Sequence, residues 1–348
     1  MPKVTILLPT LTGLLALIGL LLASGCLPKP PASAGGTPIM VYGFSVMQDA
    51  LEKDIFPGFS AEWKKERGED IHFVSSFAGS ETITNQILHG VGAKVAILSI
   101  ERDVERLREG RAVTSNWQAP GLGGVVNRTP FVILVRRGNP KRIRDFPDLA
   151  RPGVKLIHPD PVSSGGAQWS LLAIYGSELV KSERRTGRRD EARALRTLTA
   201  IWRNVISTPG SAREARTHFE TGYGDALITY ELDGLLMKEA GAPFNIVVPE
   251  ATIFSEHPAV IIDRNVTPAE RPLVEAFLRY LWSDEAQRAF VKRNLRSATD
   301  EALNAANPKF AQIKLPFTID YFGGWERAYP EIIEGVWRER VRRALMRR

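Results

Sequence analysis

The chain has 348 residues, of which 44% are hydrophobic and 24% charged, and its net charge is +7. This length is enough for a well-buried core and favours two domains or one large domain with two lobes. The basic residues are dispersed, apart from residues 183–189 and the C-terminal tail, and the sequence has no aromatic-interleaved basic stripe or zinc pattern. We therefore do not expect a nucleic-acid partner.

The N-terminus has the pattern of a secretory signal. Lys3 precedes an apolar stretch, residues 4–22, which ends in Ala23-Ser24-Gly25-Cys26. Cys26 is the only cysteine, so it can form neither an intrachain disulfide nor a cysteine metal cluster. Its position after small residues resembles a lipobox, in which the thiol is acylated and residues 1–25 are removed, although Ala23 stands where Leu is usual. An uncleaved membrane anchor is the alternative. Both interpretations place the globular part outside the cytoplasm.

A tether and then a regular alternation of strands and helices follow. Residues 26–38 are rich in Pro, Gly and Ser and are expected to be a flexible linker. After it, strands are expected at 39–45, 71–75 and 95–99, and helices at 49–66, 81–89 and from 104 onward. The run 95–99 is almost continuously apolar, which is typical of a parallel strand buried on both faces. This part of the chain predicts a doubly wound α/β lobe.

The alternation resumes after a long extended run at residues 125–137. Strands are expected at 154–159, 226–231, 244–249 and 259–263, and helices at 143–149, 168–180, 195–205, 268–282 and 284–293. The very polar stretch 181–193 is expected to be a solvated turn and helix start. Chain crossings near residues 125–132 and 257–262 would give two lobes, each a mixed sheet flanked by helices. Lobe 1 would then be residues 39–125 and 258–348, and lobe 2 residues 126–257.

The segment Ser164-Gly165-Gly166-Ala167 lies between an apolar strand and a helix. The first N–H groups of a helix have no partner within it, the helix dipole is positive there, and glycines let an anion approach the backbone. An ordinary serine cap is the alternative for this segment alone. However, Ser45, Ser80 and Tyr230 also fall at or just after strand ends. Because α/β folds bind ligands in clefts at the carboxyl ends of their strands, we expect these residues to line one interlobe cleft.

Several segments resemble the sulfate- and thiosulfate-binding proteins of bacterial ABC importers: residues 58–64, 78–80, 135–141, 152–154, 158–169 and 317–325. The similarity runs in register from about residue 40 to residue 331. It implies the type II periplasmic binding protein fold, with a tetrahedral oxyanion held between two lobes and delivered to the membrane subunits of an ABC permease. We expect a monomer that needs no cofactor or metal and contacts the membrane through its lipid anchor.

The resemblance also assigns site residues. In the family, dehydrated sulfate is held by neutral donors, and the corresponding positions here are Ser80, Ser164, Gly165, Gly166 and either Ser211 or Ala212. Sulfate at neutral pH has no proton to donate, so a site that offers only donors suits it, whereas protonated phosphate would need an acceptor.

Three positions depart from the family pattern. Tyr230 replaces an indole donor, and its phenol can both donate and accept. The early Ser-Tyr-Asp turn is Gly43-Phe44-Ser45-Val46, in which Ser45 becomes the candidate hydroxyl donor. Gln168 stands where Arg is usual. Sulfate is the expected ligand, and thiosulfate, molybdate, tungstate and phosphate stay open.

Two other functional classes were weighed. Ser164 with His158 would resemble a hydrolytic pair, but the G-x-S-x-G elbow is missing and no orienting acid is evident, so we do not expect an enzyme. A sensor or docking lipoprotein of the same fold is the second alternative. A neighbouring permease and ATPase in the genome would distinguish a transporter component from it.

Overall fold

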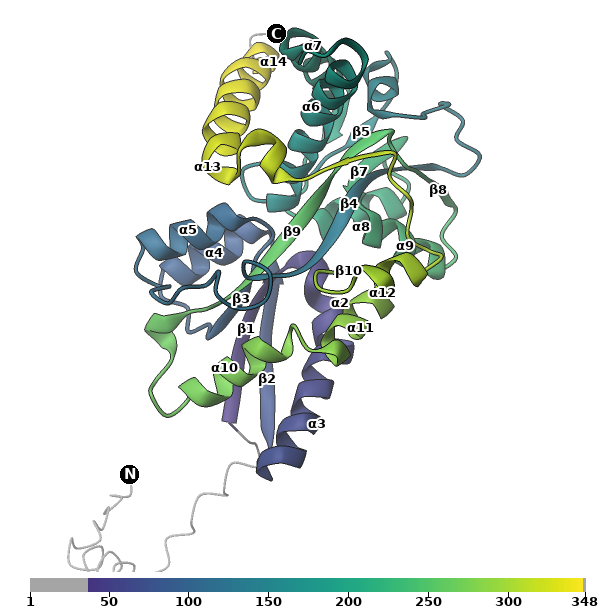
Figure 1. Cartoon of the computed structure of the whole chain (residues 1–348). Helices are drawn as coiled ribbons and strands as arrows, with labels where there is room; N and C mark the ends of the chain where they lie inside the picture. Colours follow the sequence, from purple (N-terminus) through teal and green to yellow (C-terminus); the bar gives the residue numbers. More distant parts are fainter. Residues whose placement is uncertain (1–36, 347–348) are drawn as a thin grey trace, which may run out of the picture.

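The computed structural model describes residues 37–346 (Figure 1). Its strands are β1 (Thr37–Phe44), β2 (Ile71–Ala78), β3 (Val95–Ile97), β4 (Val125–Arg136), β5 (Leu156–Ile157), β6 (Val205–Ser207), β7 (Ala226–Tyr230), β8 (Phe244–Val247), β9 (Ala251–Ile261), β10 (Arg296–Ser297) and β11 (Leu315–Phe317). Its longer helices are α3 (Phe56–Arg67), α4 (Ser80–Leu88), α5 (Glu101–Glu109), α6 (Gly165–Thr186), α7 (Glu191–Trp202), α8 (Ala212–Glu220), α9 (Glu231–Glu239), α10 (Arg271–Tyr280), α11 (Asp284–Lys292) and η6 (Tyr329–Arg342). Shorter helical segments are η1 (Ser45–Met47), α2 (Gln48–Ala50), η2 (Leu51–Ile55), η3 (Phe146–Ala150), η4 (Asp263–Asn265), α12 (Glu301–Ala306), η5 (Ile319–Phe322), α13 (Trp325–Ala328) and α14 (Arg343–Met346).

The strands form one mixed sheet with the main order β2-β1-β3-β9-β4-β7-β5-β6. At one end β1 pairs in parallel with β2 and β3, and at the other end β5 pairs in parallel with β6 and β7. Between these two parallel sets lie β4 and β9, which are long and antiparallel to each other. Figure 1 shows both strands running from the lower half of the molecule into the upper one. The expected two-lobed α/β fold with mixed strands is therefore confirmed.

The central strands are buried on both faces. Along β4, Phe131, Ile133 and Val135 belong to the large core beneath α6 and α7, whereas Val132 and Leu134 pack toward α8 and α9. This alternation follows from the two-residue period of a strand. The lower half is built in the same way, with α3 and α10 on one face and α4 and α5 on the other (Figure 1).

Helix α6 is longer than the sequence pattern predicts. Residues 181–193 are predicted to form a solvated turn and the start of a helix, but α6 continues to Thr186 and ends at Gly187, whose φ of 72° is left-handed, before α7 begins at Glu191. The polar residues are held by ion pairs, because the buried carboxylate of Glu178 lies 2.8 Å from both Lys181 Nζ and Arg193 Nε. These ion pairs therefore stabilise almost two further helical turns beyond the predicted end of the helix at residue 180.

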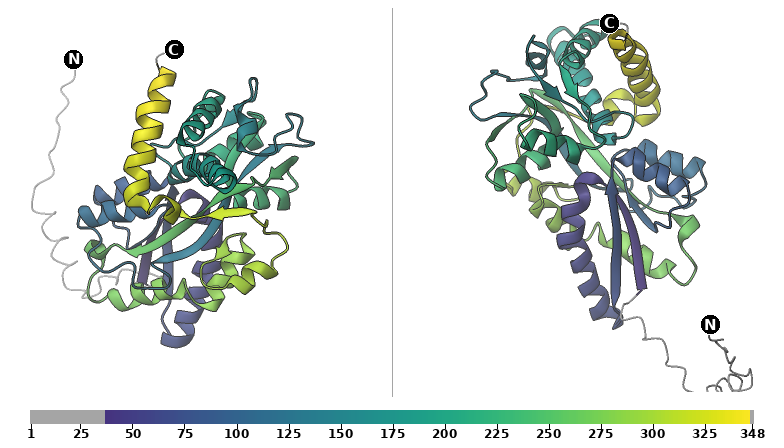
Figure 2. Two further views of the ribbon diagram at one scale, coloured as in Figure 1. Left: turned by 45° about the horizontal axis from the view of Figure 1, so that its top comes forward. Right: turned by 180° about the vertical axis from the view of Figure 1, so that it is seen from behind.

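The C-terminal segment, which the sequence pattern left irregular after residue 293, is largely ordered in elements. β11 pairs in parallel with the first residues of β9, and η6 packs against α6 and α7 (Figure 2). Trp325 packs edge-on against Trp169 of α6, with ring centroids 4.7 Å apart. The last part of the chain thus lies on the upper half, beside the start of α6.

Candidate functional site

Four of the helical segments that follow parallel strands carry the predicted serine and glycine residues or lie beside them. η1 follows β1, α4 follows β2, α6 follows β5 and α8 follows β6, so all four starts lie at the carboxyl ends of strands (Figure 1). Two of them are capped by serine. Ser164 Oγ accepts from the N–H of Ala167 at 3.3 Å, and Ser211 Oγ accepts from the N–H of Glu214 at 3.2 Å. The remaining first-turn N–H groups are the ones that helix geometry leaves available to a ligand.

In the lower half, Ser80 is fixed by two hydrogen bonds. It is the first residue of α4 and is buried. Its hydroxyl donates to Asp103 Oδ2 at 2.5 Å and accepts from the N–H of Ser99 at 3.0 Å. Asp103 is fully buried on α5, and Ser99 follows β3. The Ser80 oxygen is therefore held in one position by two neighbouring segments.

In the upper half, the two glycines of α6 lie directly beneath two hydroxyl groups. A Cβ built on Gly165 would lie 2.9 Å from Ser99 Oγ, and one built on Gly166 would lie 2.7 Å from the Tyr230 oxygen. The two hydroxyl oxygens are 2.8 Å apart. Only glycine fits at these positions without displacing a neighbour, so the backbone start of α6, Ser99 and Tyr230 form one compact group.

The loops that carry these helix starts touch one another. A Cβ on Gly79 would lie 2.3 Å from the carbonyl oxygen of Ser163 and 2.8 Å from that of Gly210. Ser163 Oγ also donates to the Gly210 carbonyl at 2.8 Å. The loops before α4, α6 and α8 therefore meet at one point between the two halves.

Ser45 joins this group through Arg213. The Arg213 Nε–H donates to the Ser45 carbonyl at 3.1 Å, and its Nη2 lies 3.2 Å from Asp49 Oδ1. Arg213 follows Ala212, the first residue of α8, and Ser45 begins η1. The guanidinium thus ties the start of α8 to the start of the first helix, and it does so with its charge paired to Asp49.

Two buried carboxyl groups lie behind Ser80. Burial, followed by the negative charge of Glu81, raises the pKa of Asp103 to about 7. Glu81 is paired with Arg106 and accepts from Gln168 Nε2 at 3.2 Å. The uncharged amide of Gln168 therefore donates to the Glu81 carboxylate between α6 and α4, at the position where the family has a positive charge. A carboxyl group that is largely protonated at acidic to neutral pH repels an anion less than an ionised one.

All eight predicted site residues lie at this junction of strand ends. Ser80, Gly165, Gly166 and Tyr230 surround Ser99, while Ser164, Ser211, Ala212 and Ser45 belong to the adjoining helix starts. Ser99, Asp103 and Arg213 also belong to the group but are not among the residues predicted from the sequence. Ser99 carried a usable signal, since it ends an apolar strand-like run just as Ser45 and Tyr230 do.

His158 is not paired with Ser164. It is buried, its Nδ1–H donates to the Pro159 carbonyl at 2.7 Å, and its Nε2 contacts Ser170 Oγ. Burial lowers its pKa to about 4, so the ring is neutral at physiological pH. The histidine thus serves as a packed, hydrogen-bonded group beneath α6.

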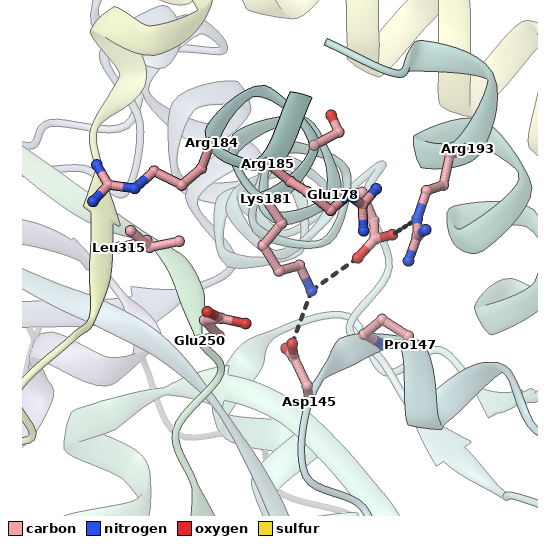
Figure 3. Close-up of a pocket in the computed structure, with 10 residues that line it drawn as sticks. Asp145, Pro147, Glu178, Lys181, Arg184, Arg185, Arg193, Glu250 and Leu315 are labelled. Carbon is pink, nitrogen blue, oxygen red and sulfur yellow. Dashed lines mark hydrogen bonds and ion pairs between the residues drawn. The ribbon is translucent and has the colours of Figure 1, made fainter. Parts of the chain in front are cut away.

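A pocket of about 400 Å³ lies near the other end of α6, where Lys181 bridges Asp145 and Glu178 at 2.8 Å each (Figure 3). Lys181 is 16 residues beyond Gly165 on the same helix, which corresponds to roughly 24 Å along the axis. Within the pocket, Asp145, Glu178, Lys181 and Arg193 are joined by ion pairs. This pocket is therefore separate from the junction of helix starts.

Within residues 37–346, no group of three or more side chains has the arrangement of a metal site. In the same part of the chain, none of the helices has both the length and the apolar character needed to cross a bilayer. The predicted signal segment and Cys26 lie outside the described residues. What the junction offers is a set of backbone N–H groups and neutral hydroxyls, which is the chemistry of an anion site at helix N-termini.

Two lobes with helix starts converging between them define a solute-binding protein of the type II periplasmic class. A family model described as bacterial extracellular solute-binding protein matches residues 39–294. A sulfate-binding protein of Synechococcus elongatus is 30% identical over 331 residues, which are 92% of this chain and 92% of that protein.

A thiosulfate-binding protein of Pseudomonas aeruginosa is 31% identical over 314 residues, covering 88% of this chain and 91% of that protein. Among solved structures, the sulfate-binding protein SubI from Mycobacterium tuberculosis is similar with a TM-score of 0.76 and 29% identity, covering 85% of this chain and 99% of that chain. The chain belongs to the bacterial extracellular solute-binding proteins, in the family of sulfate- and thiosulfate-binding proteins.

Proposed function

We propose that the protein captures a tetrahedral oxyanion, sulfate first among them, between its two lobes and delivers it to an ABC permease without chemical change. The observation that carries the proposal is that the starts of α4 and α6 meet at the Ser99–Tyr230 hydroxyl pair, with the starts of η1 and α8 adjoining them. Charge-assisted hydrogen bonds to an anion contribute roughly 1.5–3 kcal/mol each, so several converging donors hold sulfate without a paired cation. The names of the relatives, sulfate- and thiosulfate-binding proteins, support this ligand class.

Each predicted residue has a defined role in this proposal. The N–H groups of Gly165, Gly166 and Ala212 point along their helix axes toward the ligand, as the first N–H groups of any helix do. The hydroxyls of Ser45, Ser164, Ser211 and Tyr230 complete the set of donors, while Ser80, whose hydroxyl proton is bonded to Asp103, contributes its N–H at the first position of α4. Apart from the phenol of Tyr230, which can also accept, these groups are donors, and a site composed mainly of donors favours an oxyanion that carries no proton.

Binding requires the lobes to close. We propose that they hinge where β4 and β9 pass between them, near residues 125 and 257. Residues 39–125 and the chain after 258 would form lobe 1, and residues 126–257 lobe 2. The segment from β11 to η6, which the sequence pattern assigns to lobe 1, packs on β9, α6 and α7 and would move with lobe 2. An anion that contacts both lobes favours the closed state by its differential affinity.

Export and anchoring are further parts of the proposal. The matched family is extracellular, in agreement with an N-terminal secretory signal. We propose that Cys26 is lipid-modified and that the protein acts as a monomer at the outer face of the cytoplasmic membrane or in the periplasm. A sensor or docking lipoprotein of the same fold remains the competing function, and cells lacking the protein would distinguish them, since only loss of a transporter component abolishes sulfate uptake.

The ligand is tested by calorimetry and thermal unfolding with sulfate, thiosulfate, molybdate, tungstate and phosphate. A bound ligand stabilises the fold by RT ln(1 + [L]/Kd), which is about 2.7 kcal/mol when the ligand concentration is 100 times Kd. Ser164→Ala should weaken binding of the best ligand, whereas Cys26→Ala should leave it unchanged. A melting temperature that none of the five anions raises would reject the oxyanion proposal.

A further inference from the structure

Ser99 connects both lobes through three hydrogen bonds. Its N–H donates to Ser80 Oγ at 3.0 Å, its carbonyl accepts from Trp169 Nε1 at 2.6 Å, and its hydroxyl oxygen lies 2.8 Å from that of Tyr230. Ser80 follows β2 in the lower half, whereas Trp169 and Tyr230 belong to α6 and β7 in the upper half. Ser99 is itself fully buried, so its hydroxyl is not bonded to bulk water.

Tyr230 is held rigidly beside the start of α6. Its side chain is fully buried, and its ring packs against Phe131 at 4.6 Å and against His257 at 5.7 Å between centroids. The phenol oxygen lies over Gly166. Burial raises the pKa of the phenol, so it keeps its proton at all physiological pH values. The group is therefore a neutral hydroxyl in a fixed position, and only the direction of its proton can change.

The hydroxyl pair has two possible hydrogen-bond directions. Each hydroxyl carries one proton and two lone pairs. If Ser99 donates to Tyr230, the phenol proton is free to bond an oxygen of the ligand. If Tyr230 donates to Ser99, the phenol presents a lone pair to the ligand and accepts a proton from it. An indole N–H at this position would allow only the first arrangement, because it is a donor without an acceptor function.

We propose that Ser99 is a specificity-determining residue, which lets Tyr230 act as donor or acceptor so that the site binds protonated oxyanions such as hydrogen phosphate as well as sulfate. This inference rests on the proposed function, oxyanion binding at the junction of helix starts. Ser99 acts here as a positioning residue: its hydroxyl can donate to the phenol oxygen or accept the phenol proton.

Removing the Ser99 hydroxyl should affect the two ligand types differently. In Ser99→Ala the phenol proton has no internal acceptor, so it must point at the ligand. Sulfate still accepts this proton. When hydrogen phosphate binds with its own proton facing the phenol, two donors oppose each other. One of these buried donors is then left without a partner. An unsatisfied buried donor is costly enough to weaken binding by about tenfold or more.

The test is calorimetry of the full protein with sulfate and with inorganic phosphate at neutral pH. Wild type should bind both anions. Ser99→Ala should raise the phosphate Kd at least about tenfold and the sulfate Kd by less than about threefold. Ser177→Ala is the matched control, because Ser177 is also buried, lies further along α6, and its hydroxyl has no hydrogen-bond partner among the described residues. This variant should leave both Kd values unchanged.

A second variant keeps the inference testable if Ser99→Ala does not fold. Tyr230→Trp supplies an N–H donor and no acceptor, so it should retain sulfate binding and lose phosphate binding by the same factor. Sulfate binding without phosphate binding in wild type, or an equal loss of both anions in Ser99→Ala, would overturn the inference while leaving the proposed function intact. If wild type binds neither of these anions nor any other oxyanion, the proposed function itself fails.

Discussion

Gly79 lies where the two lobes touch, and we predict that Gly79→Ala weakens sulfate binding without weakening the fold. Its backbone has φ −60° and ψ 142°, which any residue adopts without strain. The only obstacle to a side chain is the other lobe, since a Cβ would lie 2.3 Å from the Ser163 carbonyl oxygen and 2.8 Å from that of Gly210. The atoms that a Cβ would meet belong to the backbone, so they cannot move aside by a change of side-chain rotamer.

The size of the effect follows from this contact. A carbon atom normally stays about 3.3 Å or more from a carbonyl oxygen, so the loops must separate by about 1 Å. Overpacking of this kind costs roughly 1–3 kcal/mol. Because the clash exists only when the lobes are closed, this cost should appear almost entirely as lost affinity, a rise in Kd of roughly 5- to 150-fold.

The assay combines calorimetry with sulfate and thermal unfolding without ligand. Gly92→Ala is the matched control, because it lies in the same lobe and the nearest atom to its Cβ would be Met40 Sδ at 3.7 Å. The control should change neither the Kd nor the melting temperature. A sulfate Kd for Gly79→Ala within twofold of wild type would refute the reasoning, as would a fall in ligand-free melting temperature that accounts for the lost affinity.

Two further predictions concern stability. The folded-state pKa of Asp103 is about 7, above the unfolded value of about 3.9, so the folded state binds the extra proton between these pH values. The stabilising contribution of Asp103 should therefore be present below pH ~4 and fall by up to about 1.4 kcal/mol per pH unit as pH rises toward 7. Urea unfolding should show that the free energy of unfolding of Asp103→Asn increases relative to that of wild type between pH 4.5 and pH 7.5. Trp325→Ala should lose about 3–5 kcal/mol of unfolding free energy, because the buried indole packs on Trp169 and leaves a cavity.

Each of these two stability predictions can be refuted by a single result. For Asp103, the difference between wild type and variant would stay constant with pH if the carboxyl were ionised in both states. For Trp325, the comparison is Tyr223→Ala, whose ring is 60% exposed and whose loss should cost less than about 0.5 kcal/mol. Equal losses from the two aromatic truncations would mean that the C-terminal segment does not pack as described.

The site was predictable from sequence to the extent that it is local. Ser80, Ser164 and Ser211 each precede or begin a helix after a short strand, and this pattern is visible in a few consecutive residues. Ser99 and Asp103 escaped prediction because their importance comes from partners far along the chain. The bond between Ser99 and Tyr230 spans 131 positions, and the one between Ser80 and Asp103 spans 23.

The same distinction explains the errors in the fold. The strands of the two lobes carry continuous apolar runs, so their existence follows from hydrophobic pattern. The end of α6 does not follow from the hydrophobic pattern, because the charged residues from Lys181 onward resemble a solvated turn. Only the structure shows that the buried Glu178 pairs with Lys181 and Arg193. Likewise η6 forms where Trp337 packs against Trp202 of α7, with centroids 5.4 Å apart, a contact that no local window contains.

The halves of the molecule are joined by three passages of chain: β4, β9, and the stretch between α12 and β11. β4 and β9 are also hydrogen-bonded to each other along their crossing. Because these two crossings are paired, the proposed hinge cannot bend one of them without the other, and the third passage is a further connection between the halves. The lobe opening proposed above therefore has to deform all three passages together.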